Sequence, residues 1–129
     1  MTNNEAIEIV MSATAEAYQQ NCPLLYLMPP FEQVERLVLD GIIHMHEPEP
    51  FEEYDYESPK ILHTIGFVKV FGKEAMTIAV EAFKMIYEKY GTKAEFMICF
   101  EYEYPNGERV EFRIVNDIDV VTILLPCEI

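Results

Sequence analysis

The stretch AEFMICFEYEYPNGERVEFRIVN, residues 94–116, decides the fold because it reads as a β-hairpin. From residue 94 to residue 104 every even position is apolar or aromatic, and three glutamates occupy odd positions. Alternation with a period of two is typical of a strand that is buried on one face. The following Tyr104-Pro105-Asn106-Gly107 is typical of a type I turn closed by a glycine bulge, because proline presets the first central φ and glycine tolerates a positive φ.

The turn also fixes the register of the two strands. If Tyr104 lies opposite Glu108, one face of the hairpin carries three apolar pairs: Tyr102 with Val110, Phe100 with Phe112, and Ile98 with Ile114. On the other face Glu103 lies opposite Arg109, and Glu101 lies diagonally to Arg113. Opposite charges in these positions stabilise a hydrated sheet surface. A slip by one residue would destroy both patterns, so the register is strongly specified.

Length and charge narrow the class of protein. The chain has 129 residues, half of them hydrophobic, which predicts a single α+β domain over residues 1–129. Lys and Arg total 9 against 23 Asp and Glu, and the formal net charge of −14 disfavours direct binding to nucleic acid or to an anionic membrane. Three widely spaced cysteines predict neither a disulfide framework nor a four-cysteine metal site. With no signal peptide and no apolar run of membrane-spanning length, we expect a cytoplasmic protein.

The periodicity along the chain predicts the element order α-α-β-α-β-β-β, with a mostly antiparallel C-terminal β-meander packed against helices. The expected elements are helices over residues 2–20, 30–41 and 76–90, a strand over 61–71, the hairpin, and a last strand over 120–125. A strand this apolar at the C-terminus is expected to be covered on both faces. The strands before and after the third helix could form a parallel βαβ unit.

Between the second helix and the first strand lies an acidic-aromatic segment, residues 44–60. It holds six carboxylates between His46 and Lys60 and three prolines, which predicts an exposed loop. Its aromatic residues have no periodicity that would bury them, so they are candidate anchors for a protein partner. The candidate partner-binding residues are Glu47, Glu49, Phe51, Glu52, Glu53, Tyr54, Asp55, Tyr56 and Glu57.

Signals for chemistry are weak. His44 and His46, with Glu47 and the later His63, are the nearest approach to a metal site, but exposed loop histidines are the better interpretation, and no metal or other cofactor is predicted. Cys99 lies mid-strand near Arg113, where a cation could lower a thiol pKa, although mid-strand cysteines are usually inert. There is no serine in a strand-to-helix elbow and no glycine-rich phosphate loop, so no catalytic residue is predicted.

Three function classes remain. The first is a small interaction module that binds a basic protein partner through its first helices and residues 47–57 of the acidic segment, as an inhibitor or a mimic of nucleic acid. The second is a small-molecule-binding protein or enzyme with a pocket between the sheet and the third helix, lined by some of Phe83, Tyr87, Phe96, Phe100, Tyr102 and Phe112. The third is a homo-oligomer that assembles through the last strand or an exposed sheet edge.

Overall fold

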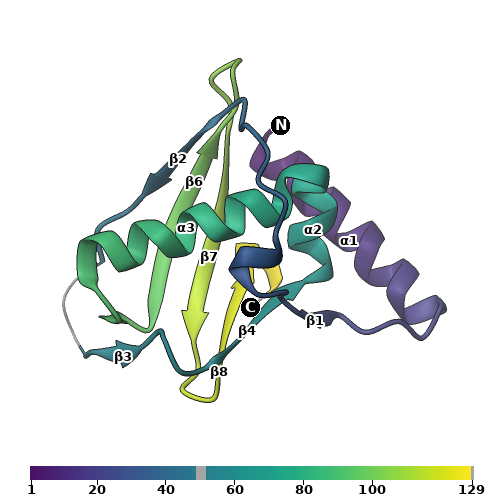
Figure 1. The fold of residues 1–129 in the computed structure, drawn as a ribbon. Coiled ribbons are helices and arrows are strands. Elements are labelled where there is room, and N and C mark those ends of the chain that lie inside the picture. Colours follow the sequence, from purple (N-terminus) through teal and green to yellow (C-terminus); the bar gives the residue numbers. More distant parts are fainter. Residues whose placement is uncertain (49–51, 129) are drawn as a thin grey trace.

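The computed structural model describes residues 1–48 and 52–128 and has an α+β fold (Figure 1). Three α-helices are present: α1 (Asn3–Gln19), α2 (Ile65–Phe71) and α3 (Ala75–Tyr90). The strands are β1 (Leu25–Leu27), β2 (Ile42–Met45), β3 (Tyr54–Asp55), β4 (Lys60–Thr64), β5 (Lys93–Ala94), β6 (Met97–Glu103), β7 (Arg109–Asn116) and β8 (Val120–Leu124). Short 3₁₀ turns are η1 (Phe31–Gln33), η2 (Gly72–Glu74) and η3 (Pro126–Glu128).

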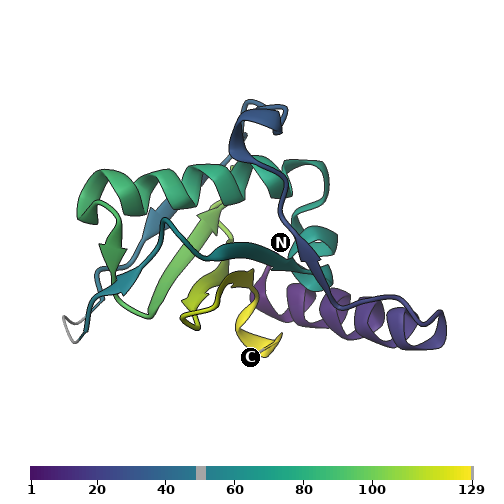
Figure 2. The ribbon, with the colours of Figure 1, turned by 60° about the horizontal axis from the view of Figure 1, so that its bottom comes forward.

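Six strands form one mixed sheet in the order β1-β4-β8-β7-β6-β2, and β3 with β5 forms a separate two-stranded sheet. Only the β4–β8 pair is parallel; the other pairs of the larger sheet are antiparallel. The C-terminal β6-β7-β8 meander is therefore antiparallel, as predicted. Helix α3 lies across one face of this sheet (Figures 1 and 2). Helix α1 packs beside α2, near the β1–β4 edge of the sheet.

The predicted hairpin register is confirmed. Phe100 pairs with Phe112 and Glu103 pairs with Arg109, with every pair between them in the expected position. At the turn, the Tyr104 N–H donates to the Glu108 carbonyl (2.8 Å) and Gly107 has a φ of 87°, as a glycine bulge requires. The first helix also begins as predicted, because Thr2 and Glu5 form a reciprocal capping box.

The apolar face of the hairpin is the centre of the core. The Phe100 and Phe112 rings are stacked with centroids 5.1 Å apart, and the rings of Phe67 and Phe71 meet Phe112 edge-on at 5.7 and 5.6 Å. Phe83 of α3 is also fully buried. Aromatic pairs in these geometries contribute beyond their buried area. The sheet and the two helices α2 and α3 thus share one hydrophobic core.

The predicted helix over residues 30–41 is wrong. Only η1 forms after the two prolines, and residues 34–41 form no helix; there the Leu37 N–H donates to the hydroxyl of Thr77 on α3 (3.1 Å). Gly41, expected to end that helix, instead lies where a Cβ would come within 2.3 Å of the Glu103 carbonyl oxygen. Tertiary contacts of this kind override weak local helix propensity.

The predicted strand over residues 61–71 is correct only in its first part. It ends at Thr64, whose hydroxyl accepts from the Phe67 N–H (3.1 Å) and so caps α2. Gly66 lies inside α2, where a Cβ would meet the Glu128 carboxylate at 2.5 Å. The Thr64 hydroxyl donates to the same carboxylate (2.6 Å), which ties the C-terminal turn to α2.

Two topological predictions also need correction. The strand before α3 does run parallel to β6, but its hydrogen-bonded parallel neighbour is β8, with β7 between β8 and β6. The last strand is central in the sheet, yet its residues alternate between buried and partly exposed as far as Ile123, so it is not covered along both faces. The open face of the sheet carries Thr122 beside Val115.

We expect the aromatic stack to dominate the stability of the fold. Replacing Phe112 by Ala should lower the free energy of unfolding by about 3 to 5 kcal/mol, because it removes a fully buried ring and leaves a cavity. The control is Phe96→Ala: Phe96 is 44% exposed, and its loss should cost about 1 kcal/mol or less. Urea unfolding of both variants measures the difference, and equal effects would contradict the central role of the stack.

Candidate functional site

The described part of the acidic-aromatic segment, residues 44–48 and 52–60, contains more regular structure than the predicted loop. It begins in β2, ends at the start of β4, and contains β3, which pairs with β5. The pairing sets Tyr54 opposite Ala94 and Asp55 opposite Lys93. Two of the predicted partner-binding residues, Glu49 and Phe51, lie outside the described residues.

Tyr56 was expected to be exposed, and this is wrong because it is fully buried. Its hydroxyl donates to the Glu95 carbonyl, its N–H donates to the Thr92 carbonyl (2.8 Å), and its own carbonyl accepts from the Tyr87 hydroxyl (3.0 Å). Burial raises the pKa of the Tyr56 phenol well above its usual value, with a smaller contribution from the nearby Glu95 charge. Tyr56 therefore holds the segment against the core and cannot itself contact a partner.

Further backbone contacts fix the segment on both sides of Tyr56. The Asn116 side-chain amide donates to the Asp55 carbonyl (2.5 Å), and the Glu52 N–H donates to the Glu95 carboxylate (2.6 Å). Asn116 is itself buried. The carboxylates of the described part of the segment remain exposed in these positions: Glu47, Glu52, Glu53, Asp55 and Glu57. The fold thus presents a row of carboxylates on a backbone held at several points.

The Asp55 carboxylate is stabilised by the turn that follows it. A hydrogen bond from the Ser58 side chain lowers the pKa of Asp55, and the Glu57 N–H, which donates to Asp55 Oδ1 (2.8 Å), lowers it further. These bonds favour the charged form. Asp55 consequently stays ionised over a wider pH range than an unpaired aspartate.

A cavity of about 460 Å³ opens between this segment and the end of α3. Its lining is predominantly acidic: Glu47, Pro48, Glu52, Glu53, Tyr90, Lys93, Ala94 and Glu95. Four of these eight side chains are carboxylates and one is a cation. The Tyr90 hydroxyl is buried and has no hydrogen-bond partner within residues 1–48 and 52–128. A ligand group that carries a positive charge and can form hydrogen bonds would complement this lining.

The sequence did not point to Tyr90, Lys93 or Glu95 as part of this site. Tyr90 lies at the end of the apolar stripe of α3, and Glu95 lies in the hairpin, so each looked structural. Lys89 also approaches the cavity, with its Nζ 3.3 Å from the Glu47 carboxylate and 5.6 Å from the centre of the Tyr90 ring. Lys89 thus shows that a cation can contact both the Tyr90 ring and the Glu47 carboxylate. A basic side chain of another protein could make contacts of the same kind.

The candidate metal ligands are not brought together. His44 and His46 share the open face of the sheet, where they contact Glu103 (2.8 Å) and Glu101 (2.7 Å) respectively. His63 is on β4, four positions away from β2 in the sheet order. Across the described parts of the chain, no group of three or more His, Cys, Asp or Glu could hold a metal ion.

The open face of the sheet is a network of opposite charges. Arg109 contacts Glu103 at 2.9 Å and Glu101 at 3.8 Å, while Arg113 contacts Glu111 at 3.2 Å in place of the expected Glu101. The His44 hydrogen bond, and then Arg109, hold the pKa of Glu103 below its usual value. These carboxylates are compensated by neighbouring cations or histidines, whereas in the acidic segment Lys89 pairs with Glu47 and Lys93 lies opposite Asp55.

Cys99 pairs with Arg113 as expected but is not an activated thiol. Burial raises the pKa of Cys99, and this outweighs the lowering by the adjacent Arg113. The thiolate is the reactive form of cysteine. A catalytic role for Cys99 is therefore disfavoured.

The expected aromatic pocket between the sheet and α3 is filled. Phe83, Phe100 and Phe112 have no exposed surface, and Tyr102 is 1% exposed. Phe96, in contrast, is exposed at the end of the sheet. The four buried rings belong to the hydrophobic core, which counts against a ligand cavity between the sheet and α3.

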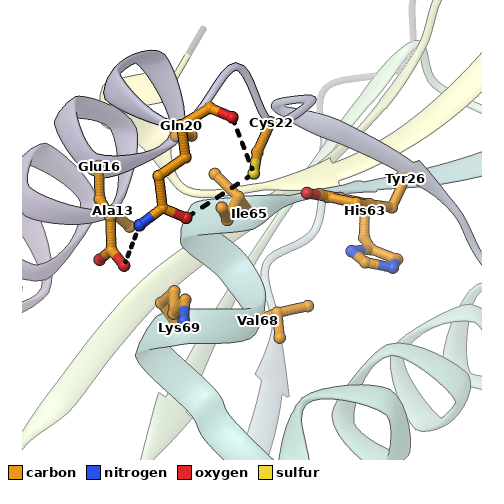
Figure 3. A pocket seen from close by; sticks show the side chains of 10 residues that line it. Ala13, Glu16, Gln20, Cys22, Tyr26, His63, Ile65, Val68 and Lys69 are labelled. Atoms are coloured by element: carbon orange, nitrogen blue, oxygen red, sulfur yellow. Dashed lines mark hydrogen bonds between the residues drawn. The ribbon is translucent and has the colours of Figure 1, made fainter.

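A second cavity, of about 390 Å³, lies between α1, α2 and the β1–β4 edge of the sheet (Figure 3). Ala13, Ile65 and Val68 supply apolar surface, and Tyr26 stacks on His63 with ring centroids 5.8 Å apart. Burial lowers the pKa of His63, so its ring is neutral at neutral pH. The charged rim of this cavity consists only of Glu16 and Lys69.

Comparison with known proteins adds no functional assignment. The chain matches no family model, and neither the curated proteins nor the solved structures gave a match. None of the helices in the described ranges is long and apolar enough to cross a membrane. Function must therefore be argued from the chain's own residues.

The burial of Tyr56 gives a direct test of how the acidic segment is held. Tyr56→Phe should lower the free energy of unfolding by about 1 to 3 kcal/mol, because it removes the buried hydrogen bond from the Tyr56 hydroxyl to the Glu95 carbonyl. In Tyr54→Phe the lost hydroxyl contacts only the exposed Glu52 carboxylate, so the change should be less than about 0.5 kcal/mol. Thermal and urea unfolding measure both, and equal losses would argue against a buried anchor.

The turn after Asp55 predicts a defined pH dependence. Because the folded pKa of Asp55 is below the usual value of 3.8, this group stabilises the fold above that pH, and the contribution is lost as pH falls through the folded pKa. Ser58→Ala should raise the pKa of Asp55 toward 3.8. NMR titration of the side-chain carboxyl carbons in the wild type and the variant measures the shift. An unchanged Asp55 titration in the variant would refute this role for Ser58.

Proposed function

We propose that this protein binds a basic protein partner through its acidic segment and the adjoining cavity. The observation that carries the proposal is the convergence of Glu47, Glu52, Glu53 and Glu95 on one cavity that also contains Tyr90. A lysine or arginine side chain of the partner would enter there and meet carboxylates and the face of an aromatic ring. The remaining carboxylates would face basic groups around it.

The way the segment is anchored supports this mode of binding. A loose acidic loop would lose conformational entropy on binding, whereas a segment already fixed by Tyr56, by Asn116 and by pairing with β5 loses less. The uncompensated charge supports it further, since the net charge is −14. Such a surface accelerates encounter with a basic partner and makes binding sensitive to salt.

The biological role that fits is inhibition by occupying a groove that otherwise holds a nucleic-acid backbone. Exposed carboxylates at successive positions of the segment would stand in for phosphates, while a direct contact with nucleic acid would be repelled. We place this activity in a reducing compartment such as the cytoplasm, in keeping with the free cysteines Cys22, Cys99 and Cys127. The partner is thus expected to be a basic, nucleic-acid-binding protein.

The test compares two variants that carry the same net charge. The first replaces Glu52, Glu53 and Glu57 by Gln; the second replaces Glu8, Glu32 and Glu35, which are exposed elsewhere, by Gln. Wild type and both variants are immobilised and used to capture proteins from the native cell extract at low and moderate salt. We expect basic proteins that are retained by the wild type and the control, lost by the segment variant, and released as salt rises.

Affinities of the captured protein, measured by titration calorimetry, complete the test. The segment variant should bind at least about tenfold more weakly than the control, which corresponds to about 1.4 kcal/mol. Equal binding by the two triple variants would show that only net charge matters. Capture of no basic protein by the wild type would refute the proposal.

A further inference from the structure

The strand β1 forms an uncharged edge in an otherwise highly charged protein. No charged residue occurs from Ala17 to Phe31, between Glu16 and Glu32. Within this stretch Leu25 is 49% exposed, Tyr26 36% and Leu27 64%. Proteins usually protect an exposed sheet edge with charges, because its unpaired backbone groups can bind another strand. This edge carries none.

The backbone of β1 is set up to pair on its outer side. The Met28 N–H donates to the Ile61 carbonyl (2.9 Å), and the Leu24 carbonyl accepts from the Ile65 N–H (2.9 Å). Backbone groups of successive residues point to opposite sides of a strand. The N–H and carbonyl of Tyr26 therefore point toward β4. The N–H and carbonyl groups of Leu25 and Leu27 point away from the sheet, because β1 is its terminal strand.

We propose that two copies of this chain pair antiparallel through β1, about a two-fold axis at Tyr26. In this register Leu25 of one copy opposes Leu27 of the other, and each such pair exchanges two backbone hydrogen bonds. All the outward groups of both leucines are then used. Each six-stranded sheet continues into the other across the axis.

The prolines on either side of β1 and the charge of the protein indicate that the strand pairing with β1 comes from a second copy of this chain. Pro23 and Pro29 bound the edge and have no N–H to donate, so a longer strand from another protein would gain few further bonds over the short, self-matching β1. Pairing through β2, the other edge of the sheet, would bring Asp40 and Glu47, which flank β2, close to the same residues of the second copy. Two copies that each carry −14 can approach closely only where charge is absent, which favours β1.

The pairing also has a consequence for the cavity in Figure 3. Tyr26 lines that cavity, stacks on His63 and would lie at the two-fold axis. The two Tyr26 side chains would then meet across the axis, because residues of a non-hydrogen-bonded pair are close together. The two cavities would form one groove that runs across the dimer.

Sedimentation equilibrium of the full chain, over a range of protein concentrations and at low and high salt, tests the pairing. We expect a reversible dimer that tightens as salt rises, because screening weakens the repulsion between the rest of the two surfaces. This is the opposite of the salt response expected for a basic partner, so the two proposals fail independently. Leu27→Glu should weaken the dimer at least about tenfold, because it adds two like charges to the paired strands of two copies that already repel one another.

The matched control is Ile42→Glu, which introduces the same charge at a residue 59% exposed on the opposite edge. It should leave the dimer nearly unchanged. A wild type that stays monomeric at every concentration and salt would overturn the proposal, as would equal weakening by the two variants. Protection of the Leu25 and Leu27 amides by an added apolar peptide, but not by rising protein concentration, would overturn self-pairing in favour of another partner.

A cross-linking experiment tests the register itself. In a chain whose Cys22, Cys99 and Cys127 are replaced by serine, Tyr26→Cys should form a disulfide dimer with diamide, which takes up the two hydrogens released by the thiols. The Cα atoms of a non-hydrogen-bonded pair, about 4.5 Å apart, are within disulfide range. Leu25→Cys is the control, since its two copies would lie too far apart. Efficient cross-linking of the control, or none at Tyr26 in a chain that dimerises, would overturn the register.

Discussion

The register between β6 and β7 is the constraint on which the rest of the structure depends. It places Phe100 on Phe112 on one face, where the stack packs against α2 and belongs to the core that also contains α3. The same register gathers Glu101, Glu103 and Arg109 on the other face. Because side chains alternate strictly along a strand, one turn geometry decides both the aromatic core and the charged open face.

The acidic segment depends on this platform through only a few contacts. Tyr56 enters the core and donates to the backbone of Glu95, and Asn116 at the end of β7 holds the Asp55 carbonyl. These contacts turn a carboxylate-rich sequence into a fixed surface. Burial of one aromatic residue therefore allows its acidic neighbours to remain exposed in defined positions, which links the packing of the core to the proposed binding of a basic partner.

Charge is distributed unevenly over the molecule, and the two proposals rest on this contrast. Carboxylates on the open face of the sheet are paired with arginine or histidine, those of the acidic segment are mostly exposed, and β1 lies in a stretch without charge. Long-range repulsion between like surfaces falls with salt, and attraction to a basic surface falls with it too. A rise in salt concentration should therefore strengthen the proposed dimer and weaken the proposed binding to a basic partner.

The sequence by itself determined the elements whose signals are local: the hairpin with its register and turn, the capping of α1 by Thr2 and Glu5, and the amphipathic α3. It also identified the acidic segment, but not the burial of Tyr56 or the cavity with Tyr90 and Glu95. Those features join residues about forty positions apart, and no periodicity records such contacts. The same reason explains why the predicted helix over residues 30–41 is absent, since Leu37 bonds to Thr77, forty positions away, instead of to a local carbonyl.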